Sequence, residues 1–190
     1  MRRIALALLL VGLSPARARG DEPPLVADVA RAPSGGDLTV DGGLFLALPT
    51  TLGPSLSTGF GLGVLRGGTF AWGARASWST ATESSIAWTV TQWDLRLRVD
   101  GAVQHRIGRA RVGLRLGLGP TLVHETRDRN QATTETTDAA FLPAGELEAF
   151  VALHVFGPWL CVVSGGPSAV LDSGALHAGW VSLIGVGWQP

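Results

Sequence analysis

Lysine and tyrosine are absent from the 190-residue sequence, and cysteine occurs only once. All 15 basic residues are therefore arginines, and 15 acidic residues balance them. Cys161 has no partner for an internal disulfide, so we expect it to be a small apolar residue within a strand. A single cysteine also excludes a cysteine-based zinc site.

The sequence also lacks a long hydrophobic run. A membrane-spanning helix needs about 18 or more uncharged apolar residues, and no such stretch occurs. The chain is nevertheless apolar, with a mean hydropathy of +0.27 and only 16% charged residues. Its apolar residues must therefore be distributed in short elements.

The longest apolar run, Ile4–Leu13, is typical of an export signal. It follows Arg2 and Arg3, and residues 16–18 (Ala-Arg-Ala) form a small-x-small cleavage pattern. We therefore predict a signal peptide over 1–18, followed by a flexible periplasmic segment over 19–37 that is rich in proline and glycine. Cleavage leaves 12 arginines against 15 acidic residues, a balance that disfavours a nucleic-acid partner.

Residues 109–119 carry the clearest pattern in the chain, Arg-Ala-Arg-Val-Gly-Leu-Arg-Leu-Gly-Leu-Gly. Every even position is apolar, and every odd position is arginine or glycine. A period of two places these sets on opposite faces of a β-strand. Arginines spaced by glycines indicate a crowded polar interior, with the apolar face directed outward into lipid.

The same alternation recurs from residue 38 to the C-terminus. It predicts eight strands, at 38–48, 55–65, 69–79, 91–106, 109–123, 141–155, 159–171 and 175–188. Strands of about ten residues or slightly more suit a tilted membrane crossing.

The predicted connections alternate in length. The tight ones contain glycine and lie at 66–68, 107–108 and 156–158, whereas the others lie at 49–54, about 80–90, 124–140 and 172–174. Short turns at one rim and longer loops at the other are typical of an outer-membrane barrel, with the short turns in the periplasm.

Tryptophans near the strand ends predict two aromatic belts at the membrane interfaces. Trp72, Trp159 and Trp188 belong to the short-turn rim, and Trp78, Trp88 and Trp93 to the long-loop rim. Trp180 fits neither belt.

A two-residue turn at Ile107-Gly108 predicts the register of the two strands beside it; a turn at Asp100-Gly101 is the alternative. The pairs are then Asp100 with Arg115, Arg98 with Gly117, and Arg96 with Gly119. A turn at 66–68 similarly places Arg75 opposite Gly59. Long arginines thus meet residues without side chains, as a narrow lumen filled by side chains requires.

The inward positions predict an ion-pair network, because an unpaired buried charge costs several kcal/mol. Its predicted members are Arg75, Arg96, Arg98, Arg109, Arg111 and Arg115, with Asp41, Asp94, Asp100, Glu146 and Glu148, and His154 nearby. We interpret the network as structural; a proton or ion path is the alternative, and a packed interior disfavours it.

These features together resemble small outer-membrane barrels of the OmpA/OmpX type. The resemblance covers about 38–188 and is architectural. The final strand, 180–188, resembles the signal read by the barrel-assembly machinery, although Gln189 and Pro190 follow the aromatic residue that usually ends it. No peptidoglycan-binding domain follows, so that function of the family is not expected.

Catalytic motifs of other outer-membrane barrels are missing or weak. The His-x-Ser pair of lipid A deacylases does not occur, and neither does a zinc-protease or Gly-x-Ser-x-Gly motif. His124, Asp128 and Asp172 match the palmitoyltransferase barrels by location only. The acidic, threonine-rich loop 124–140 is a candidate contact for a partner, a host surface or a cation bridging lipopolysaccharide.

The sequence therefore predicts an all-β, eight-stranded antiparallel up-and-down transmembrane β-barrel over 38–190, in the bacterial outer membrane. We expect a monomer without enzymatic activity, cofactor or metal, with a structural or surface-interaction role. Its expected partners are outer-membrane lipid, lipopolysaccharide and the barrel-assembly machinery. The alternatives are a soluble lipocalin-like barrel with an apolar ligand and a lipid A-modifying enzyme.

Overall fold

The computed structural model describes residues 38–48, 56–129 and 135–190. The predicted signal peptide (1–18) and periplasmic segment (19–37) lie outside the described residues. In the part that is described, no helix is long and apolar enough to cross a membrane.

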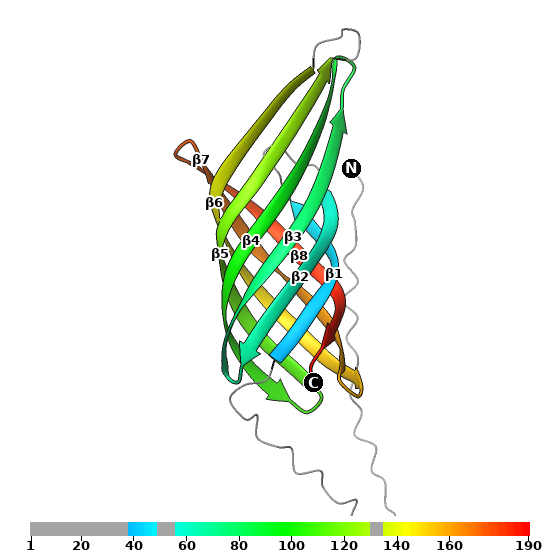
Figure 1. Cartoon of the computed structure of the whole chain (residues 1–190), viewed down its shortest axis with the longest axis vertical. Coiled ribbons are helices and arrows are strands. Elements are labelled where there is room, and N and C mark those ends of the chain that lie inside the picture. Colours follow the sequence, from blue (N-terminus) through cyan, green and yellow to red (C-terminus); the bar gives the residue numbers. More distant parts are fainter. Residues whose placement is uncertain (1–37, 49–55, 130–134) are drawn as a thin grey trace, which may run out of the picture. The chain divides into compact units, whose positions relative to one another are not determined.

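Eight antiparallel strands form a closed barrel in which each strand pairs with the next and β8 pairs with β1 (Figure 1). The strands are β1 (Leu38–Leu48), β2 (Ser57–Gly67), β3 (Phe70–Ser84), β4 (Trp88–Ile107), β5 (Ala110–Arg129), β6 (Glu135–Phe156), β7 (Trp159–Asp172) and β8 (Ala175–Trp188). The predicted fold class is confirmed, and the predicted strand order matches one for one.

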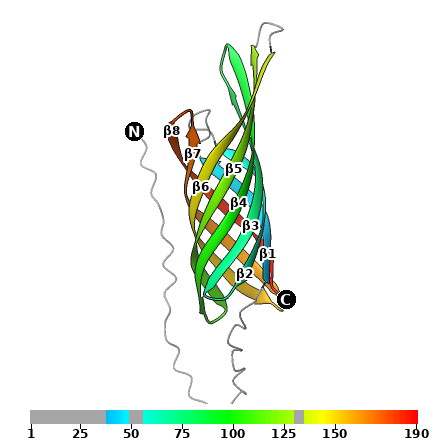
Figure 2. The ribbon, with the colours of Figure 1, turned by 60° about the vertical axis from the view of Figure 1, so that its left-hand side comes forward.

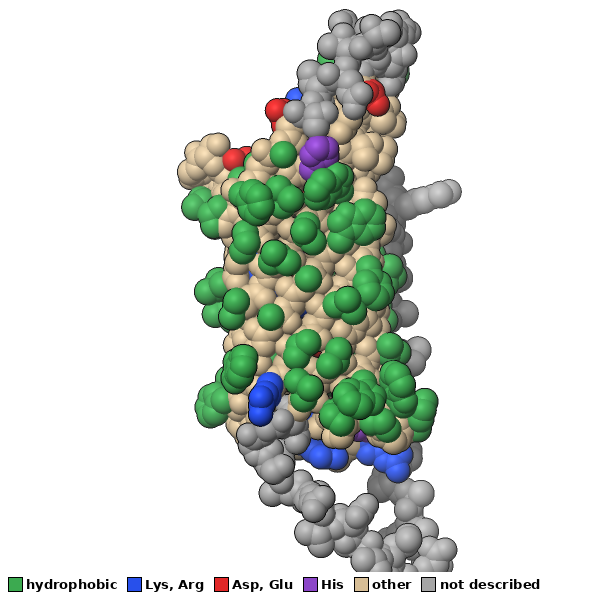
Figure 3. Space-filling model, viewed as in Figure 1, with side chains coloured by type: hydrophobic (Ala, Val, Ile, Leu, Met, Phe, Trp, Pro, Cys, Tyr) green, Lys and Arg blue, Asp and Glu red, His purple; other side chains and the backbone are tan. Residues whose placement is uncertain are grey.

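The apolar face of the barrel is on the outside. Leucine, valine, phenylalanine and tryptophan side chains cover the outer wall (Figure 3), and Leu62, Val99 and Leu116 are each at least half exposed. The alternate positions face inward and are buried, among them Arg75, Asp100 and Glu148. A soluble lipocalin-like barrel would have the reverse arrangement, so that alternative is wrong.

Four neighbouring strands continue past the rest of the barrel and form what we call the projecting sheet. It comprises residues 81–84 of β3, 88–92 of β4, 124–129 of β5 and 135–143 of β6 (Figures 1 and 2). The pairing of β2 with β3 stops at Thr58↔Thr80, and that of β7 with β6 stops at Ala144↔Val170. The stretches predicted as loops at 80–90 and 124–140 are therefore mostly strand, because backbone pairing continues where hydrophobic alternation ends.

The predicted turn between β4 and β5 is wrong by one residue. Ile107 pairs with Ala110, so the turn consists of Gly108 and Arg109, and Gly108 has a φ of 59° that suits glycine. Asp100 consequently lies opposite Gly117, and Arg115 lies opposite Ala102. Apart from Arg109, which moves into the turn, the shift leaves the side chains of β4 and β5 on their predicted faces, because both strands keep their inward positions.

The register of β2 and β3 differs similarly. Arg75 lies opposite Gly63, whereas Gly59 lies opposite Ser79. The prediction that Arg75 lies opposite a glycine is therefore right, but the glycine is Gly63 and not Gly59.

Apolar side chains fill both ends of the lumen. One cluster at the long-loop end contains Phe45, Ala47 and Val181. Two clusters at the short-turn end contain Leu65, Ala71, Ala102 and Phe150, and Ala152, Leu160, Val162 and Leu183. The charged side chains therefore occupy the middle of the barrel between apolar layers.

Candidate functional site

The middle of the lumen holds a buried ionic cluster that we call the lumen network. It consists of Asp41, Arg75, Asp94, Arg96, Arg98, Asp100, Arg115, Glu146 and Glu148, all buried. The strands that supply them are β1, β3, β4, β5 and β6.

Arg75 contacts three carboxylates and lies at the centre of the network. Its Nη1 donates to Glu148, and its Nη2 lies 3.0 Å from Glu146 Oε2 and 3.4 Å from Asp100 Oδ1. The planar guanidinium suits this role because it can donate along several directions at once.

Arg115 pairs with Glu148, which lies directly opposite it on β6. Its Nη2 is 3.0 Å from Glu148 Oε2, and its Nη1 is 3.9 Å from Asp41 Oδ2. Ser164 Oγ also donates to Glu148 Oε2, at 2.7 Å. The predicted pair between Asp100 and Arg115 is thus wrong: with the turn shifted, the carboxylate of Asp100 pairs with Arg75.

Two further arginines lie toward the long-loop end of the lumen. Arg98 Nη2 is 3.1 Å from Glu146 Oε1 and donates to Thr121 Oγ1 at 2.8 Å. Arg96 Nη2 is 3.4 Å from Asp94 Oδ2, and its guanidinium lies 5.2 Å from the centre of the Phe45 ring. The apolar layer therefore contacts the ionic layer directly through a cation–π arrangement.

Three residues predicted for the network lie apart from it. Arg111 is buried at the short-turn end, where it donates to Thr39 Oγ1 at 3.0 Å and Gln189 Oε1 at 2.5 Å. Arg109 is exposed in the β4–β5 turn, which corrects its prediction as a lumen residue. His154, near the end of β6, is half-buried, and its backbone N–H donates to the carbonyl of Arg109.

Glycines make room for the network. A Cβ added at Gly117 would lie 2.6 Å from Asp100 Oδ1 and 3.2 Å from Arg75 Nη2. A Cβ at Gly63 would lie 2.5 Å from Asp41 Oδ1. The lumen is filled at this level, so large side chains pass only where the facing residue has none.

The tryptophans gather at both ends of the outer wall. Trp159 and Trp188 are directly opposite each other at the short-turn end, and Trp72 lies near the start of β3. Trp78 and Trp93 lie on the outer face toward the other end, where Trp93 stacks on His124 with ring centroids 4.9 Å apart.

Two tryptophans depart from the predicted belts. Trp88 is the first residue of β4 and lies opposite Arg129 at the far end of the projecting sheet, well past Trp93. Trp180, predicted to fit neither belt, lies opposite Leu48, the last residue of β1. Trp180 therefore lies at the long-loop end of the barrel, on the side where the strands are short. Because the strands differ in length, the position of Trp180 in the sequence does not reveal this.

The residues considered for palmitoyltransferase chemistry are not brought together as an acid–base set. His124 faces outward and stacks on Trp93, and Asp128 is exposed in the projecting sheet. Asp172 is the last residue of β7, which is separated from β5 by β6. Within residues 38–48, 56–129 and 135–190, no group of three His, Cys, Asp or Glu side chains could hold a metal ion.

The projecting sheet presents polar side chains on both faces. Thr82, Thr91 and Thr126 form a row of directly opposed residues, and the hydroxyls of Thr82 and Thr91 are 3.5 Å apart. Its described charged side chains are Glu83, Glu125, Arg127, Asp128 and Asp138, and Arg127 pairs with Glu125. This region is therefore acidic.

Comparison with known proteins identifies the fold. No protein-family model and no curated protein sequence matches the chain. Among solved structures, it is similar to Ail, the attachment invasion locus protein of Yersinia pestis, in complex with the heparin analogue sucrose octasulfate (TM-score 0.56, 12% identity, covering 82% of this chain and 99% of Ail). The chain has the fold of small eight-stranded outer-membrane barrels.

Two other structures support the same conclusion. Neisserial surface protein A gives a TM-score of 0.53 at 8% identity, over 82% of this chain and 96% of that protein. A major outer membrane protein from Thermus thermophilus gives 0.56 at 10% identity, over 82% and 99%. At such identities the likeness concerns the fold alone.

Proposed function

We propose that the chain is a non-enzymatic, monomeric outer-membrane protein that carries the projecting sheet at the cell surface, where the sheet contacts a partner. The observation that carries this proposal is the division of the molecule into a filled barrel and a sheet that extends beyond it. A filled lumen provides no wide path for solutes, so the exposed sheet is the part available for interaction.

The two outer edges of the projecting sheet support an interaction role. Among the described residues, β2 does not pair with β3 beyond Thr80, and β7 does not pair with β6 beyond Ala144, so one side of each of these strands has no partner there. Unpaired strand edges present backbone N–H and C=O groups that can pair with another chain. The barrel itself has no such edge because β1 and β8 close it, which favours a monomer.

The charge of the sheet restricts the class of partner. The residues of the sheet include five acidic residues and two arginines; Glu83, Asp128 and Asp138 are exposed, and Arg127 is paired with Glu125. This surface favours a neutral or basic partner and disfavours a sulfated polyanion such as the ligand of the Ail structure. Outer-membrane lipid and lipopolysaccharide would surround the apolar wall, and the barrel-assembly machinery would insert the chain.

Cysteine labelling on intact cells tests the placement. In a Cys161→Ser background, Asp128→Cys in the projecting sheet should react with a membrane-impermeant maleimide, whereas Gly108→Cys in the short turn should react only after lysis. Labelling of both positions, or of Gly108→Cys alone, on intact cells would contradict the proposed orientation.

Binding to charged surfaces tests the partner class. Cells that display the protein should adhere to polylysine more strongly than to heparin, and replacement of Glu83, Asp128 and Asp138 by their amides should remove the difference. Equal adhesion of the charged and amide forms to polylysine would exclude this surface as the contact.

A further inference from the structure

Three exposed arginines lie at the short-turn end of the barrel. Arg66 ends the outward-facing set of β2, Arg106 is near the end of β4, and Arg109 is in the β4–β5 turn. None of the three forms an ion pair with a described carboxylate. In the part of the chain that the structure describes, every side-chain carboxylate outside the lumen lies at the opposite end of the molecule.

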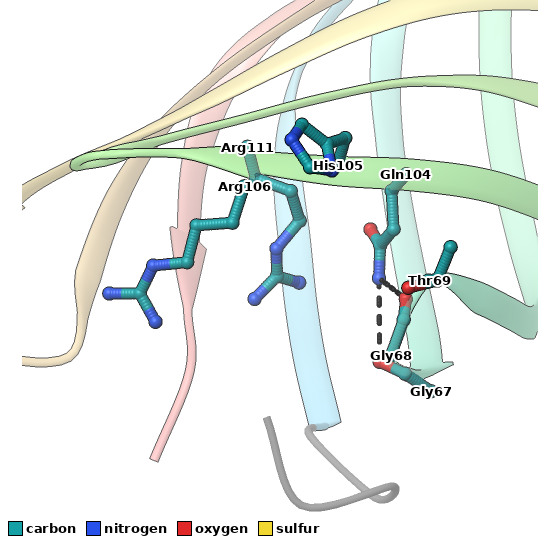
Figure 4. A pocket seen from close by; sticks show the side chains of 7 residues that line it. All are labelled: Gly67, Gly68, Thr69, Gln104, His105, Arg106 and Arg111. Carbon is teal, nitrogen blue, oxygen red and sulfur yellow. Dashed lines mark hydrogen bonds between the residues drawn. The ribbon is translucent and has the colours of Figure 1, made fainter. Parts of the chain in front are cut away.

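Two of these arginines, Arg106 and Arg109, line depressions at the mouth of the barrel. Arg106 and Arg109 line a pocket of about 300 Å³ together with His154, Phe156 and Gly157. Arg106 also lines a second pocket of about 240 Å³, together with Arg111, Gln104 and the turn Gly67–Thr69 (Figure 4). Both pockets are thus bordered by at least two arginines.

Hydrogen bonds fix the turns that carry the cluster. Gln104 Nε2 donates to the carbonyl of Gly68 at 2.7 Å, which joins the β2–β3 turn to the end of β4 (Figure 4). The backbone N–H of His154 donates to the carbonyl of Arg109 at 2.9 Å, which joins the β4–β5 turn to β6. The arginines are therefore carried by one interconnected rim.

Exposed apolar side chains lie immediately beside the arginines. Trp72 is directly opposite Arg66 and is 67% exposed, Ile107 separates Arg106 from the turn, and Phe156 lines the same pocket as Arg109. Aromatic side chains exposed near strand ends mark the depth at which lipid headgroups begin. The guanidinium groups are therefore positioned where phosphates of a membrane leaflet would lie.

We propose that Arg66, Arg106 and Arg109 bind the phosphate groups of anionic phospholipids in the leaflet at the short-turn end. Guanidinium groups bind phosphate oxygens through paired, charge-assisted hydrogen bonds. A soluble anion would contact only the arginines, whereas a phospholipid also covers the apolar residues beside them. This inference rests on the proposed placement in a membrane, and it concerns the end of the barrel opposite the projecting sheet.

Lipid retention tests the proposal. The refolded chain is inserted into vesicles of phosphatidylcholine with phosphatidylglycerol, extracted with detergent, and its bound lipids are quantified by mass spectrometry. The wild-type protein should be enriched in phosphatidylglycerol over the vesicle composition, by about fivefold for each arginine that contacts an anionic headgroup. The variant Arg66→Gln/Arg106→Gln/Arg109→Gln should return to the vesicle composition, and Arg127→Gln in the projecting sheet should keep the enrichment.

Heat-modifiable migration on gels identifies variants that have not folded, and single Arg→Gln variants replace the triple one if it fails. Enrichment that persists in the triple variant, or that is absent from the wild type, would overturn the proposal. A gain in thermal stability from inorganic phosphate in pure phosphatidylcholine, equal to that from phosphatidylglycerol, would assign the arginines to a soluble anion instead. Failure to insert into either vesicle would count against the membrane placement itself.

Discussion

The lumen network and the projecting sheet both carry acidic residues and arginine, but the two regions use them under opposite conditions. Glu148 is 1% exposed and contacts Arg75, Arg115 and Ser164, whereas Glu83 in the sheet is exposed to solvent. A buried charge is costly unless its partners are fixed, but an exposed charge is stabilised by water. We therefore expect the lumen network to restrict substitution, whereas the sheet should tolerate it.

Removal of a central carboxylate should have the largest effect. Glu148→Leu leaves Arg115 without its nearest carboxylate in a buried site, and we expect a loss of about 3–5 kcal/mol in the free energy of unfolding. Urea unfolding in lipid vesicles, followed by tryptophan fluorescence, measures it. Glu83→Leu is the control in the projecting sheet; equal losses for both variants would remove the distinction between the two regions.

Crowding of the lumen should have the next largest effect. Gly117→Val places a Cβ 2.6 Å from Asp100 Oδ1, and overpacking of this kind costs about 1–3 kcal/mol. Gly101 is the matched control because a Cβ there meets nothing within 4 Å. If Gly101→Val proves as destabilising as Gly117→Val under the same unfolding conditions, the lumen is not filled at the level of the network.

The smallest effect is expected for the ion pair in the projecting sheet. Arg127 is more than half exposed, so its pair with Glu125 should contribute only about 0–1 kcal/mol. A double-mutant cycle with Glu125→Gln and Arg127→Gln, compared with a cycle for Glu148 and Arg115, measures the two coupling energies. A larger coupling in the sheet than in the lumen would reverse the comparison.

The sequence predicts which side of the barrel wall a residue faces better than it predicts which residue lies opposite it on the next strand. The period of two assigned Arg75, Arg115 and Glu148 to the inside because a one-residue slip would move a whole strand to the wrong face. A two-position change in pairing keeps the faces, so nothing in the alternation distinguishes a turn at Ile107-Gly108 from one at Gly108-Arg109. The partner of Asp100 depended on that turn and was therefore predicted wrongly.

The projecting sheet was missed for a different reason. Hydrophobic alternation arises only where one face of a strand meets lipid or a packed core. In the β3 part of the sheet both faces carry polar side chains, as at Thr82 and Glu83, so the pattern disappears there although the backbone pairing continues. Threonine-rich composition in 133–137 was a usable signal, because threonine favours strands.

The apolar layers of the lumen were also not predicted. Phe45, Leu160 and Leu183 occupy inward positions, and each is at most 2% exposed. In β1 an inward phenylalanine lies between outward leucines. The alternation of polar and apolar residues is therefore weaker in β1, but it is still present. The interior was expected to be polar throughout, whereas the structure has a polar middle between two apolar ends.

The pairing of β1 with β8 has a consequence for how the chain folds. Val40 pairs with Trp188, so the strand that leaves the ribosome first acquires its second neighbour only when the last strand is available. Until then, β1 and β8 each expose a row of backbone groups that lipid cannot hydrogen-bond. A partly assembled sheet is consequently unfavourable inside the bilayer, and contacts of such long sequence separation form slowly. Insertion and closure should therefore proceed together, as one late event that follows export of the entire barrel sequence.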